Sequence, residues 1–300
     1  MKNDFKIDFV GIAAAKSGTT WLAHMLDAHP QICVSEPKEV CYFNRELNSS
    51  ETIKQKGLAG PFLNKNRDKP ISWYANHFSH CRVGSIIGEY SPVYFYDPEA
   101  PYAIKRAFPG VKLIVALRNP IERAYSEYWM FRSSFKIEER PFDEAVRETG
   151  TMYIRKGLYS EQLARYFNLF PRSRIHIIFY DDIRKNPKDV MRKLYAFLGV
   201  DDAFAPKEIG GVSNYAKESR IKGSVEFMNK TVAFLSARNL SWIVRFLRII
   251  KFNKAFLRII TKKINYPPMS EETREYLRGV FREDIKKLEN LLCVDLSRWD

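Results

Sequence analysis

A buried strand, a polar turn and a helix are predicted near the start of the chain, where residues 7–22 read IDFVGIAAA-KSGTTWL. The apolar run from Ile7 to Ala15 is typical of a strand that is buried on both faces. A helix is predicted to follow from Thr19 to Ala28. The turn between them consists of Lys16, Ser17, Gly18, Thr19 and Thr20.

This turn has the chemistry of an anion-binding site. The first N–H groups of a helix lack partners within the helix, and the helix dipole adds positive potential at that end. Gly18 allows the backbone to approach a phosphate closely, the nearby hydroxyls can donate hydrogen bonds, and Lys16 supplies a charge. An ordinary helix start capped by Ser or Thr is the alternative that this turn leaves open.

The rest of the pattern alternates strands with helices. Such alternation is typical of a parallel sheet covered by helices, so we predict one α/β domain over residues 1–300 with a central parallel sheet. Further strands are predicted at 83–87, 111–117 and 174–180, and further helices at 98–108, 120–131, 162–170, 187–198 and 271–292.

Composition restricts the class of protein. The 300 residues are 45% hydrophobic and 14% aromatic, which excludes a disordered chain. The most apolar stretch, residues 240–260, contains five basic residues, so no membrane span is predicted. The first ten residues lack the apolar core of a signal peptide, so none is expected to be removed. The 49 basic and 35 acidic residues give a net charge of +14, which indicates an anionic partner.

The turn fails the best-known phosphate-binding pattern. A Walker A loop needs a second Gly directly before its Lys, and here Ala15 precedes Lys16. Asp181 and Asp182 are weak candidates for the acidic residue that such enzymes place after a second strand. A GxGxxG dinucleotide turn is also missing from the sequence.

The same residues resemble a known family. The string at 16–22, followed by His29-Pro30 and by PKEVCYF at 37–43, is similar to the opening of sulfotransferases that use 3′-phosphoadenosine 5′-phosphosulfate (PAPS). The bacterial and heparan-sulfate-type branch is the more similar one. The resemblance implies a P-loop sulfotransferase-like fold. It also implies that a 5′-phosphosulfate is bound by Lys16, Ser17, Gly18, Thr19, Thr20 and Trp21.

A second element follows the predicted strand at 111–117, in the string LRNPIERAYS at 117–126. An Arg at a strand end can bind a phosphate through two hydrogen bonds, and Ser126 lies about two helical turns beyond Arg118. By residue type alone, Arg118 could equally form a structural ion pair and Ser126 could face solvent. The string matches the family pattern R-[ND]-P-x-x-R-A-x-S, which implies that Arg118 and Ser126 bind the 3′-phosphate.

Glu39 is the predicted catalytic base. Sulfuryl transfer requires positioning, charge stabilisation and removal of one proton from the acceptor, and a carboxylate near Lys16 and Lys38 suits that task. A solvated, ion-paired glutamate is the alternative, and Glu36 is a local competitor. The family stretch E-x-x-[FY]-F, which carries the base, favours Glu39. Lys16 would then stabilise the leaving group, and no metal is expected.

The chain also departs from the family. Cys41 stands where heparan-type enzymes carry His, and Tyr90 stands where they carry Lys. Both replacements are expected on the acceptor side, so a glycosaminoglycan substrate is not implied. Two weaker matches suggest further nucleotide contacts, namely Lys262 in KKINYP at 262–267 and Arg220 in NYAKESR at 214–220.

A basic and apolar helical insertion is predicted at 231–270, which contains no acidic residue. Packing on the domain is the favoured interpretation, with peripheral contact to an anionic membrane or a lipid-like acceptor as the alternative. Nucleic acid is not an expected partner, because no known binding motif is present. The oligomeric state cannot be predicted from these patterns.

Cysteine and histidine contribute no predicted site. Cys33, Cys41, Cys81 and Cys293 are scattered and are expected as free thiols in a reducing compartment. His77, His80 and Cys81 have metal-ligating side chains, but a surface helix end is the favoured interpretation.

The sequence therefore predicts a PAPS-dependent sulfotransferase in a bacterial cytoplasm, in contact with a membrane if the basic insertion binds one. It would transfer a sulfuryl group to a hydroxyl or amine of a carbohydrate, lipid or other small acceptor and release adenosine 3′,5′-bisphosphate. Two alternatives remain from other classes: a kinase-like P-loop enzyme, and a membrane-surface binding protein with an inactive nucleotide site.

Overall fold

The computed structural model describes residues 5–44, 66–135, 138–207, 209–210, 216–219, 261–264 and 266–299. Contacts divide the chain into two compact units. The first comprises residues 1–127, 140–212 and 269–300, and the second comprises 128–139 and 213–268. A single domain over residues 1–300 stays a prediction, and each unit is described by itself.

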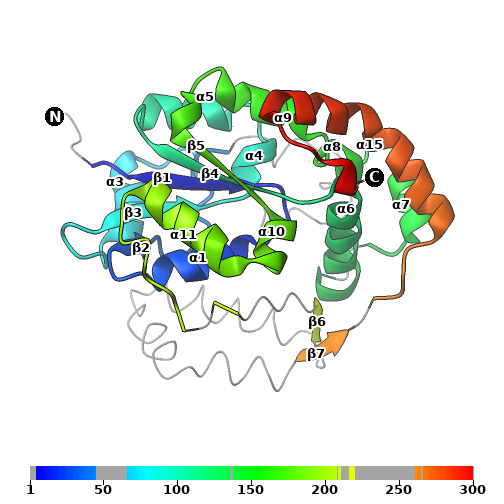
Figure 1. Cartoon of the computed structure of the whole chain (residues 1–300), viewed down its shortest axis with the longest axis horizontal. Helices are drawn as coiled ribbons and strands as arrows, with labels where there is room; N and C mark the ends of the chain where they lie inside the picture. The colour runs from blue at the N-terminus through cyan, green and yellow to red at the C-terminus, as the bar shows by residue number, and fades with distance from the viewer. Residues whose placement is uncertain are drawn as a thin grey trace. The chain divides into compact units, whose positions relative to one another are not determined.

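The first unit contains a five-stranded parallel sheet in the order β2-β3-β1-β4-β5 (Figure 1). The central β1 and β4 are apolar and almost wholly buried, as expected for strands covered on both faces. The strands are β1 (Phe9–Ala13), β2 (Ile32–Val34), β3 (Ile86–Tyr90), β4 (Lys112–Leu117) and β5 (Ile175–Phe179).

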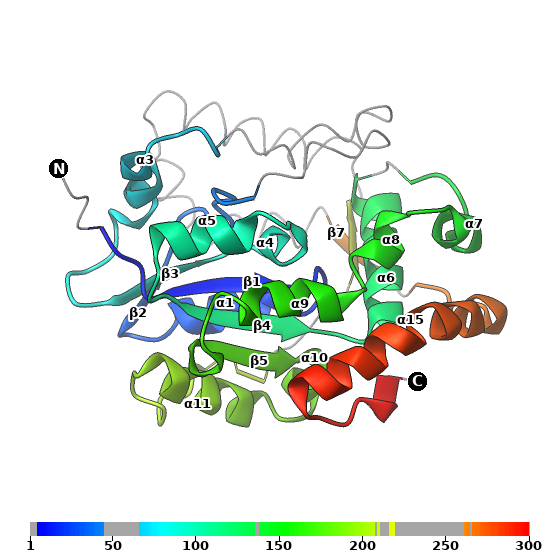
Figure 2. The same ribbon diagram turned by 90° about the horizontal axis from the view of Figure 1, so that it is seen from above.

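Helices cover both faces of this sheet (Figures 1 and 2). One face packs against α1 (Thr19–Asp27), α10 (Tyr180–Lys185) and α11 (Pro187–Leu198), whose apolar side chains form a core with alternate residues of the strands. The other face is covered by α4 (Val93–Tyr96), α5 (Ala100–Ala107) and α9 (Tyr159–Phe167). The predicted α/β class and parallel sheet are confirmed.

One long helix and several short elements complete the first unit. The long helix α15 (Glu271–Leu292) packs along α9, and its Phe281 ring lies where a side chain on Gly157 would have to go. The remaining elements are α3 (Ile71–Ala75), η2 (Asn76–Phe78), α6 (Pro120–Trp129), α7 (Phe142–Arg147), α8 (Met152–Arg155), η4 (Arg172–Arg174) and η5 (Ser297–Trp299).

The second unit begins within the last turn of α6, which continues as a π-helical segment, η3 (Met130–Phe135). Its two described strands, β6 (Ala216–Ser219) and β7 (Thr261–Ile264), are antiparallel. The indole of Trp129 stacks on the ring of Tyr266 with centroids 4.6 Å apart.

Several predicted boundaries need correction. The strand predicted at 83–87 is observed as β3, which begins at Ile86, and Val83 is fully exposed in the preceding turn. The bounds of α11 and α15 agree with the prediction. Among the described residues, no helix is both long and apolar enough to span a membrane. Most of the predicted insertion at 231–270 and the whole of Arg220 lie outside the described residues.

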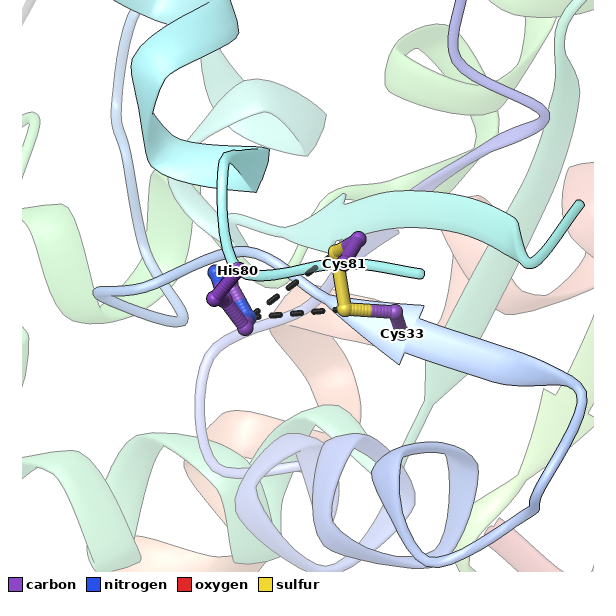
Figure 3. Close-up of side chains that lie close together, drawn as sticks. All are labelled: Cys33, His80 and Cys81. Carbon is purple, nitrogen blue, oxygen red and sulfur yellow. Dashed lines mark hydrogen bonds between the residues drawn. A yellow bond between two sulfur atoms is a disulfide. The ribbon is translucent and has the colours of Figure 1, made fainter. Parts of the chain in front are cut away.

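The expectation of four free thiols is wrong. Cys33 on β2 and Cys81 form a disulfide across 48 residues, and the His80 ring lies beside it (Figure 3). His80 Nε2 is 3.4 Å from Cys33 Sγ and 3.1 Å from the carbonyl oxygen of Val34. Because the fold brings two distant cysteines together at the edge of the sheet, sequence spacing could not reveal the pair. Cys41 and Cys293 are free thiols, as predicted.

Candidate active site

The predicted site segments follow the carboxyl ends of parallel strands. The turn at 16–20 follows β1, Arg118 follows β4, and the segment with Glu39 follows β2. In open α/β sheets this edge is where ligands bind, because strand ends and helix starts meet there. The topology therefore gathers these segments at one edge of the sheet.

The turn after β1 has the backbone of an anion-binding loop. Lys16 and Gly18 both have positive φ, at 69° and 84°. Gly18 precedes α1, and none of the described side chains caps the first N–H groups of this helix. Ser17 is fully buried, and within the described part of the chain its hydroxyl has no hydrogen-bond partner. A buried hydroxyl beside uncapped N–H groups fits a bound anion, which would satisfy both.

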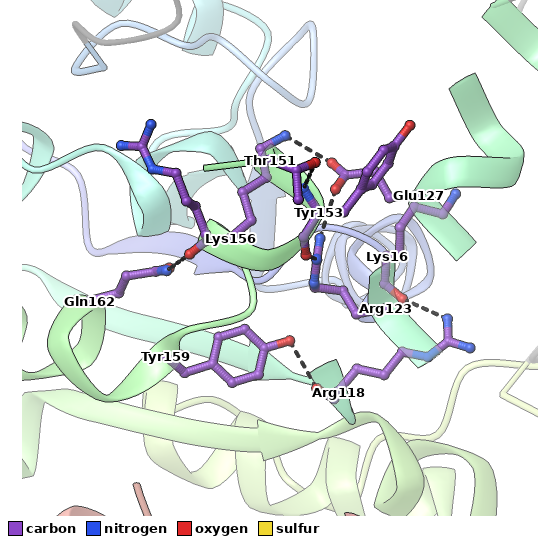
Figure 4. Close-up of polar contacts among 10 residues, drawn as sticks. Lys16, Arg118, Arg123, Glu127, Thr151, Tyr153, Lys156, Tyr159 and Gln162 are labelled. Carbon is purple, nitrogen blue, oxygen red and sulfur yellow. Dashed lines mark hydrogen bonds and ion pairs between the residues drawn. The ribbon is translucent and has the colours of Figure 1, made fainter. Parts of the chain in front are cut away.

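Arg118 joins the turn to β4. Its Nη1 donates a hydrogen bond of 3.1 Å to the carbonyl oxygen of Lys16, and its guanidinium lies 4.7 Å from the centre of the Tyr180 ring. The Tyr159 hydroxyl donates to the Arg118 carbonyl oxygen at 2.9 Å (Figure 4). Burial is the main cause that lowers the pKa of the Arg118 guanidinium from its ordinary value. The structure thus brings Lys16 and Arg118 into contact.

The string after β4 also sets the start of α6. The Asn119 side chain accepts hydrogen bonds from the N–H groups of Ile121 and Glu122, at 2.9 and 3.3 Å, and so caps the helix. Its amide donates to the carbonyl oxygen of Trp299 at 3.0 Å. Ser126 lies on α6 and is half-buried.

A buried ionic cluster lies behind the turn and was missed by sequence reasoning (Figure 4). The Glu127 carboxylate pairs with Arg123 at 2.7 Å and with Lys156 at 2.8 Å. Burial alone would raise the pKa of Glu127, but the two cations outweigh burial and hold it below its usual value. Burial lowers the pKa of Lys16, and the Glu127 carboxylate opposes that change. Arg123 and Glu127 are four residues apart on one helix, a spacing that favours an ion pair, so this part of the cluster could have been predicted from the sequence.

Lys156 is a largely buried charge with a structural role, because its side chain is 13% exposed and its ammonium is paired with the Glu127 carboxylate. Arg155 lies with its guanidinium 5.6 Å from the centre of the Tyr96 ring.

Glu39 lies in the segment after β2, where its side chain is 48% exposed. Its carboxylate pairs with the Lys38 ammonium at 2.7 Å. The N–H of Tyr90, at the end of β3, donates to the Lys38 carbonyl oxygen at 3.2 Å and ties this segment to the sheet. Exposure is compatible with contact to an acceptor.

The two departures from the family have different surroundings. Burial, and then the carboxylates of Glu39 and Glu89, raise the pKa of the Cys41 thiol to about 12, so it stays protonated at neutral pH. Tyr90 is fully buried with its ring against Gly11, where any side chain would collide with it. Its place on the acceptor side stays a prediction.

A second carboxylate near this segment was also missed. Glu89 is fully buried at the end of β3 and accepts hydrogen bonds from the hydroxyls of Tyr74, Ser91 and Tyr94. Burial raises its pKa to about 7, and these hydrogen bonds limit the rise. A glutamate at the end of a buried strand, followed by Ser and Tyr, was the available signal.

The other polar candidates have structural roles. Asp181 accepts a hydrogen bond of 2.9 Å from the indole of Trp299, and Asp182 pairs with Arg298 at 3.2 Å, so both hold the C-terminal turn. His77 contacts the Glu36 carbonyl oxygen at 2.8 Å. In the described residues, the metal-ligating side chains that cluster are those of His80 and the two disulfide cysteines.

Lys262 lies on β7 opposite Glu218, in the second unit. Its predicted contact with the nucleotide stays a prediction.

Comparison with known proteins decides the family. A family model described as the sulfotransferase domain matches residues 6–288. The chain belongs to the sulfotransferase family. It is therefore an enzyme of sulfate transfer. A crystal structure of a sulfotransferase from Alicyclobacillus acidocaldarius has the same fold, with a TM-score of 0.68 at 24% identity, and covers 98% of this chain and 99% of that one.

Curated relatives extend the comparison. This sulfotransferase is 24% identical to the membrane-associated sulfotransferase kil1 of Dictyostelium discoideum. The matched region covers 97% of this chain and 66% of kil1. It is 25% identical to human heparan sulfate glucosamine 3-O-sulfotransferase 5, over 85% of this chain and 72% of the relative.

Proposed function

We propose that this sulfotransferase uses PAPS as its donor and transfers the sulfuryl group to a hydroxyl or amine of a carbohydrate, lipid or other small acceptor. One observation carries the proposal. Arg118 donates to the backbone of Lys16, so cationic residues from two neighbouring strand ends meet just before a helix whose first N–H groups no described side chain caps. Such an arrangement suits a donor with phosphate groups at two positions.

The residues present fit this donor. The Ser17 hydroxyl is buried and unpartnered within the described residues, and Gly18 adopts a backbone conformation that exposes N–H groups to an anion. We assign the 5′-phosphosulfate to the turn that ends with Thr19, Thr20 and Trp21, and the 3′-phosphate to Arg118 and Ser126. Lys262 and Arg220 are proposed as further contacts.

Bound PAPS supplies a sulfuryl group on a phosphate leaving group. Glu39 is proposed to accept the proton of the acceptor hydroxyl or amine as the new bond to sulfur forms. The Lys38 ammonium, 2.7 Å away, restricts where the Glu39 carboxylate can point. Lys16 is proposed to balance the negative charge that develops on the bridging oxygen as the sulfur–oxygen bond breaks.

The kinase-like alternative needs an acidic residue after a second strand. Its candidates, Asp181 and Asp182, instead bind Trp299 and Arg298 in the C-terminal turn, which argues against this alternative. The relatives named for heparan sulfate make a carbohydrate the first acceptor to try. The disulfide favours an oxidising compartment over the predicted cytoplasm. Membrane contact through residues 231–270 remains a prediction.

Glu39→Gln tests the assignment of the base, with Glu36→Gln as a matched control on the same segment. Radiolabelled PAPS is supplied with desulfated heparan sulfate and, separately, with 4-nitrophenol as probe acceptors. We expect Glu39→Gln to lower kcat by at least about a hundredfold while the affinity for adenosine 3′,5′-bisphosphate stays within twofold. Glu36→Gln should retain kcat within about threefold. Equal activity of Glu39→Gln and wild type would contradict the assignment.

A further inference from the structure

The residues that follow Glu39 are held through their backbone by one buried carboxylate. The N–H of Cys41 donates to Ser91 Oγ at 3.2 Å, and the Ser91 hydroxyl donates to Glu89 Oε2 at 2.5 Å. Cys41 has a φ of 52°, a conformation that a residue of its type adopts only when its surroundings impose it.

The next residue is held by a second relay. The N–H of Tyr42 donates to the Tyr94 hydroxyl at 2.7 Å, and that hydroxyl donates to Glu89 Oε1 at 2.9 Å. Two successive N–H groups, those of Cys41 and Tyr42, are therefore fixed by one carboxylate, each through a single hydroxyl. Glu89 and Tyr94 are fully buried, so water does not compete for these bonds.

We propose that Glu89 is a positioning residue for the proposed base: by fixing Cys41 and Tyr42, the second and third residues after Glu39, it sets where the Glu39 carboxylate enters the site. The inference rests on the proposed function. The Glu39 side chain is half exposed, and among the described residues the ion pair with Lys38 is what holds it, so its placement depends on the backbone that carries it. A displacement of about 1 Å at a reacting group can cost roughly a hundredfold in rate.

The structure supplies a matched pair of variants. Tyr74 and Tyr94 both donate their hydroxyls to Glu89 Oε1, at 2.7 and 2.9 Å, and both are fully buried. The Tyr94 hydroxyl also accepts the N–H of Tyr42, whereas the hydroxyl bond recorded for Tyr74 goes to Glu89. Tyr74→Phe and Tyr94→Phe thus remove equivalent bonds to the carboxylate, and Tyr94→Phe alone also releases the segment that carries Glu39.

Two measurements on the full chain test the inference. Amide hydrogen exchange followed by mass spectrometry should show exchange of residues 41 and 42 at least about tenfold faster in Tyr94→Phe than in Tyr74→Phe. With the probe acceptor that the wild type sulfates, kcat should fall at least about tenfold in Tyr94→Phe and in Ser91→Ala, and within threefold in Tyr74→Phe. The KM for PAPS should stay within twofold in all three. Thermal unfolding of Tyr74→Phe and Tyr94→Phe should show similar losses of stability.

The outcomes separate this inference from the proposed function. Equal kcat in the two phenylalanine variants, or faster exchange without loss of kcat, would show that Glu89 has a purely structural role, while sulfuryl transfer by the wild type would leave the proposed function intact. A wild type that binds neither PAPS nor its product would overturn both. Loss of kcat that follows loss of stability in every variant would also overturn the positioning role.

Discussion

At the scale of single residues, Glu89 combines full burial with a set of hydroxyl donors. The groups that face it are the hydroxyls of Tyr74, Tyr94 and Ser91 and the nearby Cys41 thiol. Burial raises the pKa of both tyrosines and brings that of Cys41 to about 12, so these neighbours stay protonated near neutral pH. Glu89 is the member of this group that titrates near pH 7, because its own pKa is raised to about 7.

This raised pKa predicts a pH dependence of stability. Between about pH 4.5 and 7 the folded chain binds more protons at Glu89 than the unfolded chain, so rising pH lowers the free energy of unfolding across that window. Glu89→Gln loses this pH dependence. From pH 4.5 to 8, the free energy of unfolding of the variant should therefore rise relative to that of wild type by up to roughly 3 kcal/mol. Urea unfolding at several pH values measures it, with Glu275→Gln as a surface control. Parallel curves for Glu89→Gln and wild type would contradict the raised pKa.

At the scale of elements, predictability follows the strength of local signals. The helix α11 was predicted with its observed bounds because Asn186 caps it, Pro187 starts it and Gly199 ends it with a φ of 85°. The edge strand β2 has three residues, too few for a periodic pattern, and it was not predicted. The disulfide of β2 could not be predicted either, because only the fold places Cys33 beside Cys81.

The disulfide predicts a contribution to stability. It joins β2 to the turn before β3 and closes a loop of 48 residues, which restricts the unfolded chain. Cys33→Ser with Cys81→Ser should therefore lower the free energy of unfolding by about 2–4 kcal/mol, and reductant should lower that of wild type by a similar amount. Cys293→Ser is the control, because Cys293 is a free exposed thiol. Four titratable thiols in the unreduced, denatured wild type would contradict the disulfide.

At the scale of the whole molecule, the sheet order decides which motifs meet. The two phosphate-type motifs were visible in the sequence because each lies within a few residues of one strand-to-helix junction. The adjacency of β1 and β4, which puts Arg118 on the Lys16 carbonyl oxygen, is a property of the fold. The links from Glu89 through Ser91 and Tyr94 to residues 41 and 42, and the ion pair between Glu127 and Lys156, cross tens of residues, so no local pattern reveals them.

The central claim is that the strand ends of β1 and β4 bind the two phosphates of the donor. Calorimetric titration with adenosine 3′,5′-bisphosphate tests it most directly, on wild type, on Arg118→Ala and on Arg192→Ala, which removes one exposed positive charge from α11. We predict binding without Mg²⁺, a Kd raised roughly 10- to 100-fold by Arg118→Ala through loss of a charge-assisted contact, and little change in Arg192→Ala. A wild type that fails to bind the bisphosphate, or an Arg118→Ala variant that binds it as tightly as wild type, would contradict the claim.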